Sequence, residues 1–377
     1  MGDEQVISLA PLSGARVGVR GNEALVSLAP GGGETGKVAE RSGRGDALLT
    51  VWHLRKYFSV GAQTFGAPKA MVQAVDGVSF SIARGETLGI VGESGCGKST
   101  TARLLMHLIE PDDGEIRFDG KTVGSRGFSA RELRRQMQMV FQDSYASLNP
   151  RLAVQDSIAF GPMAHGMSGD KASAKARDLL ALVKLDPDQF GRRYPHELSG
   201  GQRQRINFAR ALALEPRLVI LDEAVSALDK SIEAQVLNLL MDLKKNLQLT
   251  YLFISHDLSV VQYVSDQVLV MYLGKIVELG PVDDVYRRPR HPYTRALLAS
   301  RPSMDPDRRL ERSPLAGDPP NPINPPSGCR FRTRCAFAES VCERDEPVLS
   351  AQDAHPAHSA ACHMVTPGSG HSNAPVW

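Results

Sequence analysis

The chain contains two kinds of apolar pattern that indicate β-strands. Residues 78–82 alternate between apolar and polar side chains, which predicts a strand with one buried face. Residues 87–91, 218–221 and 251–254 are short, continuous apolar runs of the kind found in fully buried strands. A further apolar stretch at residues 47–51 predicts the first ordered strand.

Helical spacing fills much of the chain between these strands. Residues 99–108 and 231–246 each fit a helix, and residues 129–185 are mostly helical. Within residues 175–185, leucines and a valine make one apolar face. Strands that alternate with helices predict an α/β fold with a largely parallel sheet.

Both ends of the chain differ in composition from this α/β region. Residues 1–47 are rich in glycine, serine and alanine, which predicts a flexible leader. The α/β domain is expected to span residues 48–280. After it, proline-rich stretches interrupt regular structure, so we expect a small C-terminal extension over residues 281–367 and a disordered tail over residues 368–377.

Composition and charge exclude several classes of protein. Of the 377 residues, 42% are hydrophobic and 23% are charged, so the chain can fill a core and cover it with a polar surface. The net charge is only +2, whereas a dedicated nucleic-acid binder usually carries a large excess of basic residues. No nucleic-acid partner is therefore expected. No apolar run approaches the roughly 18 residues of a membrane-spanning helix. The acidic start of the chain is no secretory signal.

A phosphate-binding loop follows the strand expected at residues 87–91. Residues 92–99 read GESGCGKS and fit G-x-x-x-x-G-K-[ST], with a strand before and a helix after. Glycines let backbone N–H groups surround an anion, and the next helix points its positive dipole end at the phosphates. Lys98 is expected to contact the β- and γ-phosphates, and Ser99 to bind Mg²⁺. The predicted nucleotide-binding residues of this segment are Gly92, Ser94, Gly95, Cys96, Gly97, Lys98, Ser99 and Thr100.

Two carboxylates follow the apolar run at residues 218–221. A buried strand that delivers an acid to its end is how an NTPase holds Mg²⁺. We expect Asp222 to anchor Mg²⁺ through water. Glu223 is expected to be the general base for the attacking water.

Further motifs resemble those of the ATP-binding subunits of ABC transporters. Residues 198–202 read LSGGQ, which is that family's signature, and they lie shortly before Asp222. Gln142 matches the Q-loop glutamine, residues 226–229 match the D-loop, and His256 matches the switch histidine. The order and spacing of these motifs agree with the family, so the resemblance is specific.

The resemblance covers about residues 48–280 and implies a P-loop NTPase fold. That fold has a mainly parallel core sheet, an antiparallel β subdomain and a helical subdomain, here at about residues 129–200. Phe58 is the best match to the aromatic residue that stacks on adenine, with Tyr57 as the alternative.

In this family, the signature of one subunit faces the phosphate loop of another, so that ATP is held between two chains. The resemblance implies that the signature residues Ser199, Gly200, Gly201 and Gln202, and Asp229 of the D-loop, contribute to nucleotide binding across this interface. It also implies that Gln142 is a Mg²⁺ ligand and sensor. His256 is expected to hold the γ-phosphate and the water, and to be catalytic with Glu223 and Lys98.

Flanking segments resemble the oligopeptide/dipeptide permease ATPases. These are residues 147–151 (SLNPR) and 291–298 (HPYTRALL), while residues 251–261 and 271–274 favour the F subunit over its D partner. The resemblance implies bacterial uptake at the cytoplasmic face of the inner (plasma) membrane. Its implied partners are a paralogous ATPase, two transmembrane permease subunits and an external substrate-binding protein.

Peptides are the first expected cargo, while nickel, oligosaccharides and glutathione are alternatives carried by relatives of this ATPase. A non-transport ABC ATPase that acts on DNA or ribosomes, and an exporter ATPase, are the rival functions. Two positions depart from the family pattern. Ala224 replaces a proline, and Lys230 replaces an apolar residue at a position where it could alter the dimer interface.

The five cysteines indicate a metal centre more than disulfides. Cys96 stands in the phosphate loop, and the C-terminal extension holds Cys329, Cys335, Cys342 and Cys362. Four thiolates can hold a tetrahedral metal or a cubane cluster.

Residues 328–335 resemble the extension of the peptide-permease ATPases, which implies a [4Fe–4S] cluster on all four cysteines. Nearby histidines keep Zn²⁺ as the alternative, and a disulfide or no metal stays open. Arg330, Arg332 and Arg334 are expected to offset the charge of a cluster.

Overall fold

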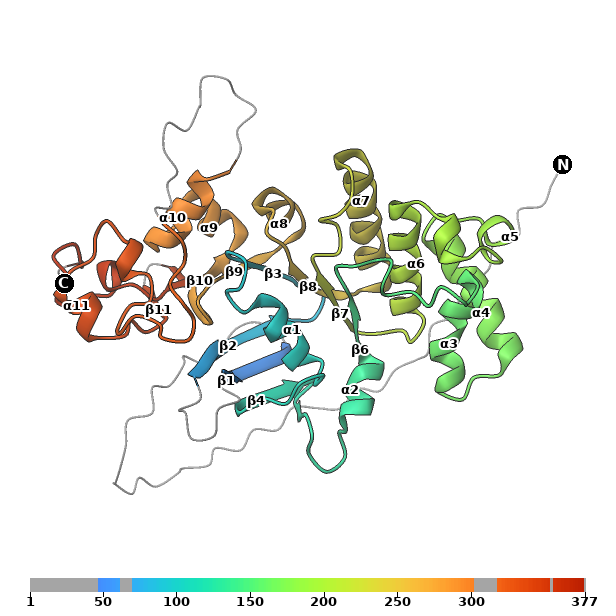
Figure 1. Ribbon diagram of the computed structural model, residues 1–377, viewed down its shortest axis with the longest axis horizontal. Coiled ribbons are helices and arrows are strands. Elements are labelled where there is room, and N and C mark those ends of the chain that lie inside the picture. Colours follow the sequence, from blue (N-terminus) through green and yellow to red (C-terminus); the bar gives the residue numbers. More distant parts are fainter. Residues whose placement is uncertain (1–46, 62–69, 302–316, 353–354, 376–377) are drawn as a thin grey trace, which may run out of the picture. The chain divides into compact units, whose positions relative to one another are not determined.

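The structure is a computed structural model that describes residues 47–61, 70–301, 317–352 and 355–375 (Figure 1). The flexible leader expected over residues 1–47 lies outside these ranges, apart from Ala47, which begins the first strand. The described residues belong to one compact unit.

Eight strands in the described ranges form the larger sheet. They are β3 Thr87–Val91, β6 Met137–Val140, β7 Leu218–Asp222, β8 Thr250–Ile254, β9 Gln267–Tyr272, β10 Lys275–Pro281, β11 Ser350–Gln352 and β12 His355–Ala360. Their order is β11-β12-β10-β9-β3-β8-β7-β6. The run from β9 to β6 is parallel, and β10, β12 and β11 continue it as antiparallel strands. The three strands predicted from continuous apolar runs are confirmed as β3, β7 and β8.

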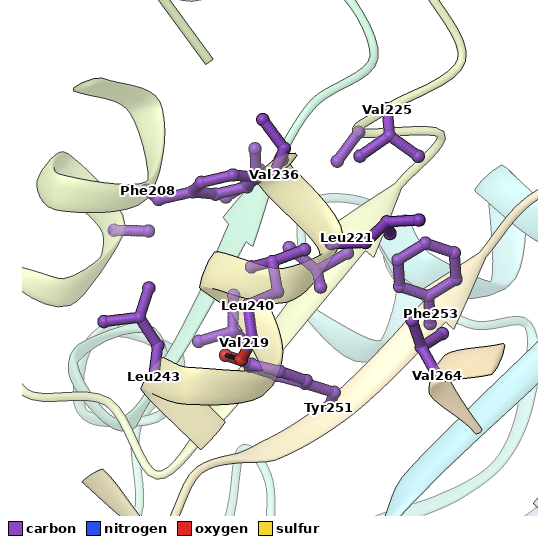
Figure 2. Close-up of a cluster of buried hydrophobic side chains, with 14 of the residues drawn as sticks. Phe208, Val219, Leu221, Val225, Val236, Leu240, Leu243, Tyr251, Phe253 and Val264 are labelled. Carbon is purple, nitrogen blue, oxygen red and sulfur yellow. Dashed lines mark hydrogen bonds between the residues drawn. The ribbon is translucent and has the colours of Figure 1, made fainter. Parts of the chain in front are cut away.

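Both faces of this sheet are buried, which explains the continuous apolar runs. Within β7, Val219 and Leu221 contribute to one core and Leu218 and Ile220 to the other. Figure 2 shows the first of these cores, where Leu240 of the helix that follows β7 packs near the sheet residues. A strand that is covered on both sides has few positions for polar side chains, so its residues are mostly apolar.

A smaller antiparallel sheet has the order β2-β1-β4-β5. Its strands are β1 Ala47–Val60, β2 Ala70–Ala83, β4 Asp113–Phe118 and β5 Lys121–Thr122. It corresponds to the antiparallel subdomain that the family resemblance implied. The strand β1 is longer than the predicted residues 47–51, because its pairing shifts register after Val51 and the shift interrupts the apolar alternation.

Helices connect and cover the strands. They are α1 Lys98–Leu105, α2 Ala130–Gln136, α3 Val154–Ala164, α4 Gly169–Leu182, α5 Pro187–Phe190, α6 Gly200–Leu212, α7 Lys230–Leu247, α8 Leu258–Val264, α9 Val282–Arg287, α10 Pro292–Ala299 and α11 Ser340–Arg344. The helices expected at residues 99–108 and 231–246 are confirmed as α1 and α7. The mostly helical region at 129–185 also contains β6, which pairs with β7 at the sheet edge. None of the described helices is both long and apolar enough to span a membrane.

The C-terminal extension is joined to the larger sheet. Its strand β12 pairs with β10, with Ala360 opposite Glu278 and Ser359 opposite Leu279. A disordered tail was expected at residues 368–377, and the described part of this segment ends at residue 375. There, His371 is buried and its Nε2 lies 2.8 Å from the carbonyl oxygen of Phe337.

Candidate nucleotide-binding and catalytic site

The phosphate loop connects the end of β3 to the start of α1. Gly97 caps α1 with φ +110°, and a Cβ atom there would lie 2.3 Å from the carbonyl oxygen of Ala74. A Cβ atom on Gly92 would lie 2.2 Å from the carbonyl oxygen of Met271. Both positions therefore require glycine. Ser94 and Gly95 form the exposed tip of the loop, and Thr100 is half-buried in α1.

The side chain of Lys98 lies along the loop. Its ammonium donates to the carbonyl oxygen of Gly92 at 2.7 Å and to that of Glu93 at 2.9 Å. The thiol of Cys96 lies 3.7 Å from the same nitrogen, and burial raises the pKa of that thiol. Cys96 therefore serves as a small, buried side chain beneath the loop.

Ser99 and Asp222 meet although 123 residues separate them. The Ser99 hydroxyl donates to Asp222 Oδ1 at 3.0 Å. The strands β3 and β7 run parallel on either side of β8, so the residues after both strands lie at the same edge of the sheet. Burial raises the pKa of the Asp222 carboxyl, and a bound cation would counteract that effect. A hydroxyl paired with a carboxylate is suited to Mg²⁺.

Glu223 adopts the left-handed backbone conformation, with φ +49°. This conformation is strained for a residue with a side chain. Hydrogen bonds hold it, since the Glu223 N–H donates to the carbonyl oxygen of Ile254 at 2.9 Å and the Ser226 hydroxyl donates to the Glu223 carbonyl at 2.9 Å. These bonds fix the backbone of Glu223 directly after β7.

Two predicted residues converge on the Glu223 carboxylate. Gln142 Nε2 donates to Glu223 Oε2 at 2.9 Å, and His256 Nδ1 lies 3.5 Å from the same oxygen. Gln142 follows β6 and His256 follows β8, so the ends of neighbouring parallel strands bring them together.

The signature begins helix α6. Ser199 is the N-cap, its hydroxyl accepts from the Gln202 N–H, and Gln202 Oε1 accepts from the Ser199 N–H at 3.0 Å. The side chain of Gln202 thus completes a capping box. A Cβ atom on Gly201 would lie 2.5 Å from a methyl carbon of Ile232, so the helix start packs closely against α7.

A cavity of about 700 Å³ runs from Ser99 and Asp222, past Gln142, to Gly200. Among the described residues, no hydrogen bond joins the signature to the phosphate loop of the same chain. Asp229 is the N-cap position of α7 and its side chain makes no cap hydrogen bond there.

The two aromatic residues considered for adenine differ in their surroundings. The hydroxyl of Tyr57 donates to Asp76 Oδ1 at 2.6 Å, and burial raises the pKa of this hydroxyl to about 12. Phe58 is 38% exposed and lies opposite Val72 in β2, two residues before the Ala74 that contacts the phosphate loop. Phe58 therefore presents the accessible ring.

The two departures from the family pattern are accommodated within the chain. Ala224 is buried. The ammonium of Lys230 donates to Asp257 Oδ2 at 2.8 Å and to Glu233 Oε1 at 3.0 Å.

The four cysteines of the extension line one small cavity: Cys329, Cys335, Cys342 and Cys362. Within the described ranges, no three His, Cys, Asp or Glu side chains are grouped to hold a metal ion. Burial raises the pKa of Cys329 to about 11 and of Cys362 to about 12. The Nε2 of His358 lies 2.7 Å from Glu278 Oε1, and the Nε2 of His363 lies 2.9 Å from the carbonyl oxygen of Asp345.

Sequence reasoning missed two contacts that hold the phosphate loop from outside it. Glu93 in the loop contacts Tyr293 of α10 and Arg334, which lies between two of the cysteines. The HPYTRALL segment and the arginines were visible as motifs. Their partner in the loop was not, because Glu93 lies 200 residues from Tyr293 and 241 residues from Arg334.

Comparison with known proteins decides the family. Residues 75–226 match the family model described as ABC transporter, and residues 277–342 match the oligopeptide/dipeptide transporter, C-terminal region. A Brucella ovis protein named as a peptide import ATP-binding protein is 52% identical over 320 residues, which cover 84% of this chain and 97% of that protein. This chain belongs to the ABC transporter ATPases. The oligopeptide transport ATP-binding protein AppF of Bacillus subtilis is 48% identical over 326 residues, or 85% of this chain and 98% of AppF.

Solved structures agree with this assignment. Part of the ABC transporter complex cbiONQ, cbiO1 from Clostridium perfringens, matches with a TM-score of 0.55 and 28% identity over 64% of this chain and 92% of that one. The ATP-binding cassette MJ0796 matches with a TM-score of 0.53 and 25% identity over 62% of this chain and 98% of that one. The latter was solved as a dimer in a post-hydrolysis state with ADP and Pi. The expected P-loop ATPase fold is thereby confirmed.

Proposed function

We propose that this ABC ATPase powers the import of di- or oligopeptides across the bacterial inner membrane. The convergence of Gln142 and His256 on Glu223, with the Ser99–Asp222 pair at the same sheet edge, carries the catalytic part of the proposal. The names of the two relatives, which are about half identical to this chain, support peptide cargo.

Each converging side chain has a distinct role in hydrolysis. Ser99, Asp222 and Gln142 would hold Mg²⁺, with Asp222 acting through water, and the ion would neutralise charge on the phosphates. Lys98 leaves its carbonyl partners to neutralise the β- and γ-phosphates. Glu223 accepts the proton of the attacking water. His256 holds that water and the γ-phosphate.

The second half of the site comes from another chain. Ser199 and the N–H groups of Gly200 and Gly201 stand at the start of the 13-residue helix α6, where the helix dipole favours an anion. We propose that they meet the γ-phosphate of a paralogous subunit's ATP, with Gln202 acting through the capping box and Asp229 contributing from the D-loop. The dimeric, nucleotide-bound MJ0796 structure supports an arrangement of this kind.

The proposed assembly contains this chain, a paralogous ATPase, two permease subunits and an external substrate-binding protein, with this chain at the cytoplasmic face. Within it, residues 48–280 act as the ATPase domain, with the helical subdomain at about 129–200. Residues 281–367 act as the extension that the peptide-transporter match describes in part.

The four-cysteine cavity is proposed to hold a [4Fe–4S] cluster. Four thiols around one cavity are the ligand set that such a cluster takes, and they support this proposal, with Zn²⁺ as the alternative. Arg330 and Arg334, which were expected to offset its charge, instead contact the carboxylates of Asp76 and Glu93. When bound, the cluster would cross-link a segment that has little apolar core of its own.

Transport by the reconstituted assembly tests the proposed function. Vesicles that contain the permeases, both ATPases and the binding protein are loaded with ATP, and uptake of a labelled dipeptide, oligopeptide, nickel, oligosaccharide or glutathione is measured. We expect peptide uptake that requires ATP and is lost with Lys98→Ala. Uptake of nickel, oligosaccharide or glutathione alone would contradict the peptide cargo, and ATP-independent uptake would contradict the energising role.

A further inference from the structure

The phosphate loop carries an acidic side chain in a segment that must bind phosphate. Glu93 is the second residue of the loop, and its side chain is 22% exposed. A carboxylate without a countercharge at this place would repel the nucleotide, since like charges repel more strongly in a partly buried site than in water.

Arg334 of the C-terminal extension supplies the countercharge. Its Nη1 donates to Glu93 Oε2 at 2.7 Å and its Nη2 donates to Glu93 Oε1 at 3.1 Å. The Arg334 side chain is only 5% exposed, and its guanidinium lies 5.9 Å from the ring centroid of Tyr272. A two-point guanidinium–carboxylate pair fixes orientation as well as charge.

The backbone of Glu93 is held at the same time. The Glu93 N–H donates to the hydroxyl oxygen of Tyr293 at 2.9 Å. Its carbonyl oxygen accepts from the Lys98 ammonium at 2.9 Å. One loop residue is therefore joined to the extension on one side and to the phosphate-binding lysine on the other.

The position of Arg334 depends on the four-cysteine segment. Arg334 ends a short 3₁₀ turn directly before Cys335. Phe331 in the same segment packs against Tyr272 and Tyr293, with ring centroids 5.3 and 5.4 Å apart. Whatever holds the cysteines together therefore also holds this turn.

A second arginine of this segment reaches the other side of the loop. Arg330 donates to Asp76 and to the carbonyl oxygen of Leu273, and it is buried. The next residue, Gly274, donates its N–H to the carbonyl oxygen of Cys96 at 2.9 Å. Both arginines thus connect the extension to the phosphate loop or to its immediate support.

We propose that Arg334 is a positioning residue of the nucleotide site, which neutralises Glu93 and makes nucleotide affinity depend on the fold of the four-cysteine segment. This inference rests on the nucleotide-binding part of the proposed function. It assigns to the extension a role in binding ATP that acts through Glu93.

A double-mutant cycle tests the inference with the purified full-length chain. The dissociation constant of MgADP is measured by titration calorimetry for the wild type, Arg334→Met, Glu93→Gln and the double variant. We expect Arg334→Met to weaken MgADP at least about tenfold, because it leaves a carboxylate unpaired beside the phosphates. In the Glu93→Gln background, the same substitution should change affinity less than about threefold, because no charge is left to neutralise.

Two further variants separate this role from general damage. Arg332→Met alters the same 3₁₀ turn, where Arg332 contacts Ser327 rather than the loop, and should leave MgADP affinity unchanged. Cys342→Ser should weaken MgADP binding with Glu93 present and much less with Glu93→Gln.

An equal loss for Arg334→Met in both backgrounds, or no loss in either, would overturn the inference. Failure of the wild type itself to bind MgADP would instead overturn the proposed function.

Discussion

Single side chains at the ends of parallel strands define the chemistry of this protein. Ser99 and Asp222 form the pair suited to Mg²⁺, and hydrogen bonds to Ile254 and Ser226 hold Glu223 in a strained backbone conformation. Strain of this kind costs about 1–3 kcal/mol and persists only where the surroundings enforce it. Its location at the proposed base supports a functional reason for it.

Replacement of Ser99 by alanine tests the metal pair. The variant loses the hydroxyl that donates to Asp222, so the Mg²⁺ concentration for half-maximal ATP hydrolysis should rise at least about tenfold. Titration of Mg²⁺ at saturating ATP measures this, with Thr101→Ser as a matched hydroxyl control in the same helix. A Ser99→Ala enzyme with an unchanged Mg²⁺ requirement would show that Ser99 is not a ligand.

The adenine contact can be assigned by a pair of variants. Phe58→Ala should weaken MgADP binding by about 1–2 kcal/mol, because base–aromatic stacking contributes roughly this much. Tyr57→Phe should leave that affinity unchanged, but should lower the free energy of unfolding by about 1 kcal/mol through the lost bond to Asp76. Calorimetric titration and urea unfolding measure the two quantities. The opposite pattern of affinities would assign adenine to Tyr57.

At the scale of elements, helix α10 is fixed by a buried polar network. His291 caps the helix, and its ring Nδ1 accepts from the Tyr293 N–H at 3.0 Å. The backbone N–H of His291 donates to Glu278 Oε2 at 3.0 Å. Glu278 also lies 2.7 Å from His358 of β12. This network joins α10 to the strands that continue the sheet into the extension, and so sets the position of Tyr293.

The pH dependence of stability tests this network. Burial lowers the pKa of His291 to about 4, although the nearby Glu278 carboxylate opposes the shift and Arg295 favours it. Between pH 6.5 and 4 the unfolded chain therefore takes up a proton at this residue and the folded chain does not, so stability falls as the pH falls. At about 1.4 kcal/mol for each pH unit, the total loss is about 3 kcal/mol.

The measurement compares the wild type with His291→Asn, which can still accept the Tyr293 N–H and does not titrate. Free energies of unfolding are determined in urea between pH 7 and pH 4. The wild type should lose about 3 kcal/mol more than the variant over this range. Parallel curves for the two proteins would mean that His291 is not held neutral by the fold.

The whole molecule shows which features a single sequence can predict. The strands β3, β7 and β8 were recognised because burial on both faces produces apolar runs, and the phosphate loop because its chemistry is local. The strand β12 has the sequence HPAHSA, which contains no apolar run, and it exists through pairing with β10 about 80 residues away. The Glu93–Arg334 pair spans 241 residues, and no local pattern specifies it.

The extension is therefore packed against the ATPase domain and is not a separate module. The metal content of its four cysteines can be predicted and measured. Purified without oxygen, the full-length chain should be brown and contain about four iron atoms, with no comparable zinc. Replacing any one of the four cysteines of the extension by serine should lower the iron content and the melting temperature. The control variant Cys96→Ser should leave the iron content unchanged. Stoichiometric zinc in a colourless protein would contradict the cluster.

Hydrolysis by this chain's own site tests the central claim most directly. In the assembled ATPase pair, the equivalent glutamate of the partner is first replaced, so that only the site containing Glu223 turns over. The rates of MgATP hydrolysis are then compared with Glu223 intact and with Glu223→Gln, and bound nucleotide is measured in parallel. The account predicts a fall of at least about a hundredfold with nucleotide still bound. Equal rates for the two assemblies would contradict it.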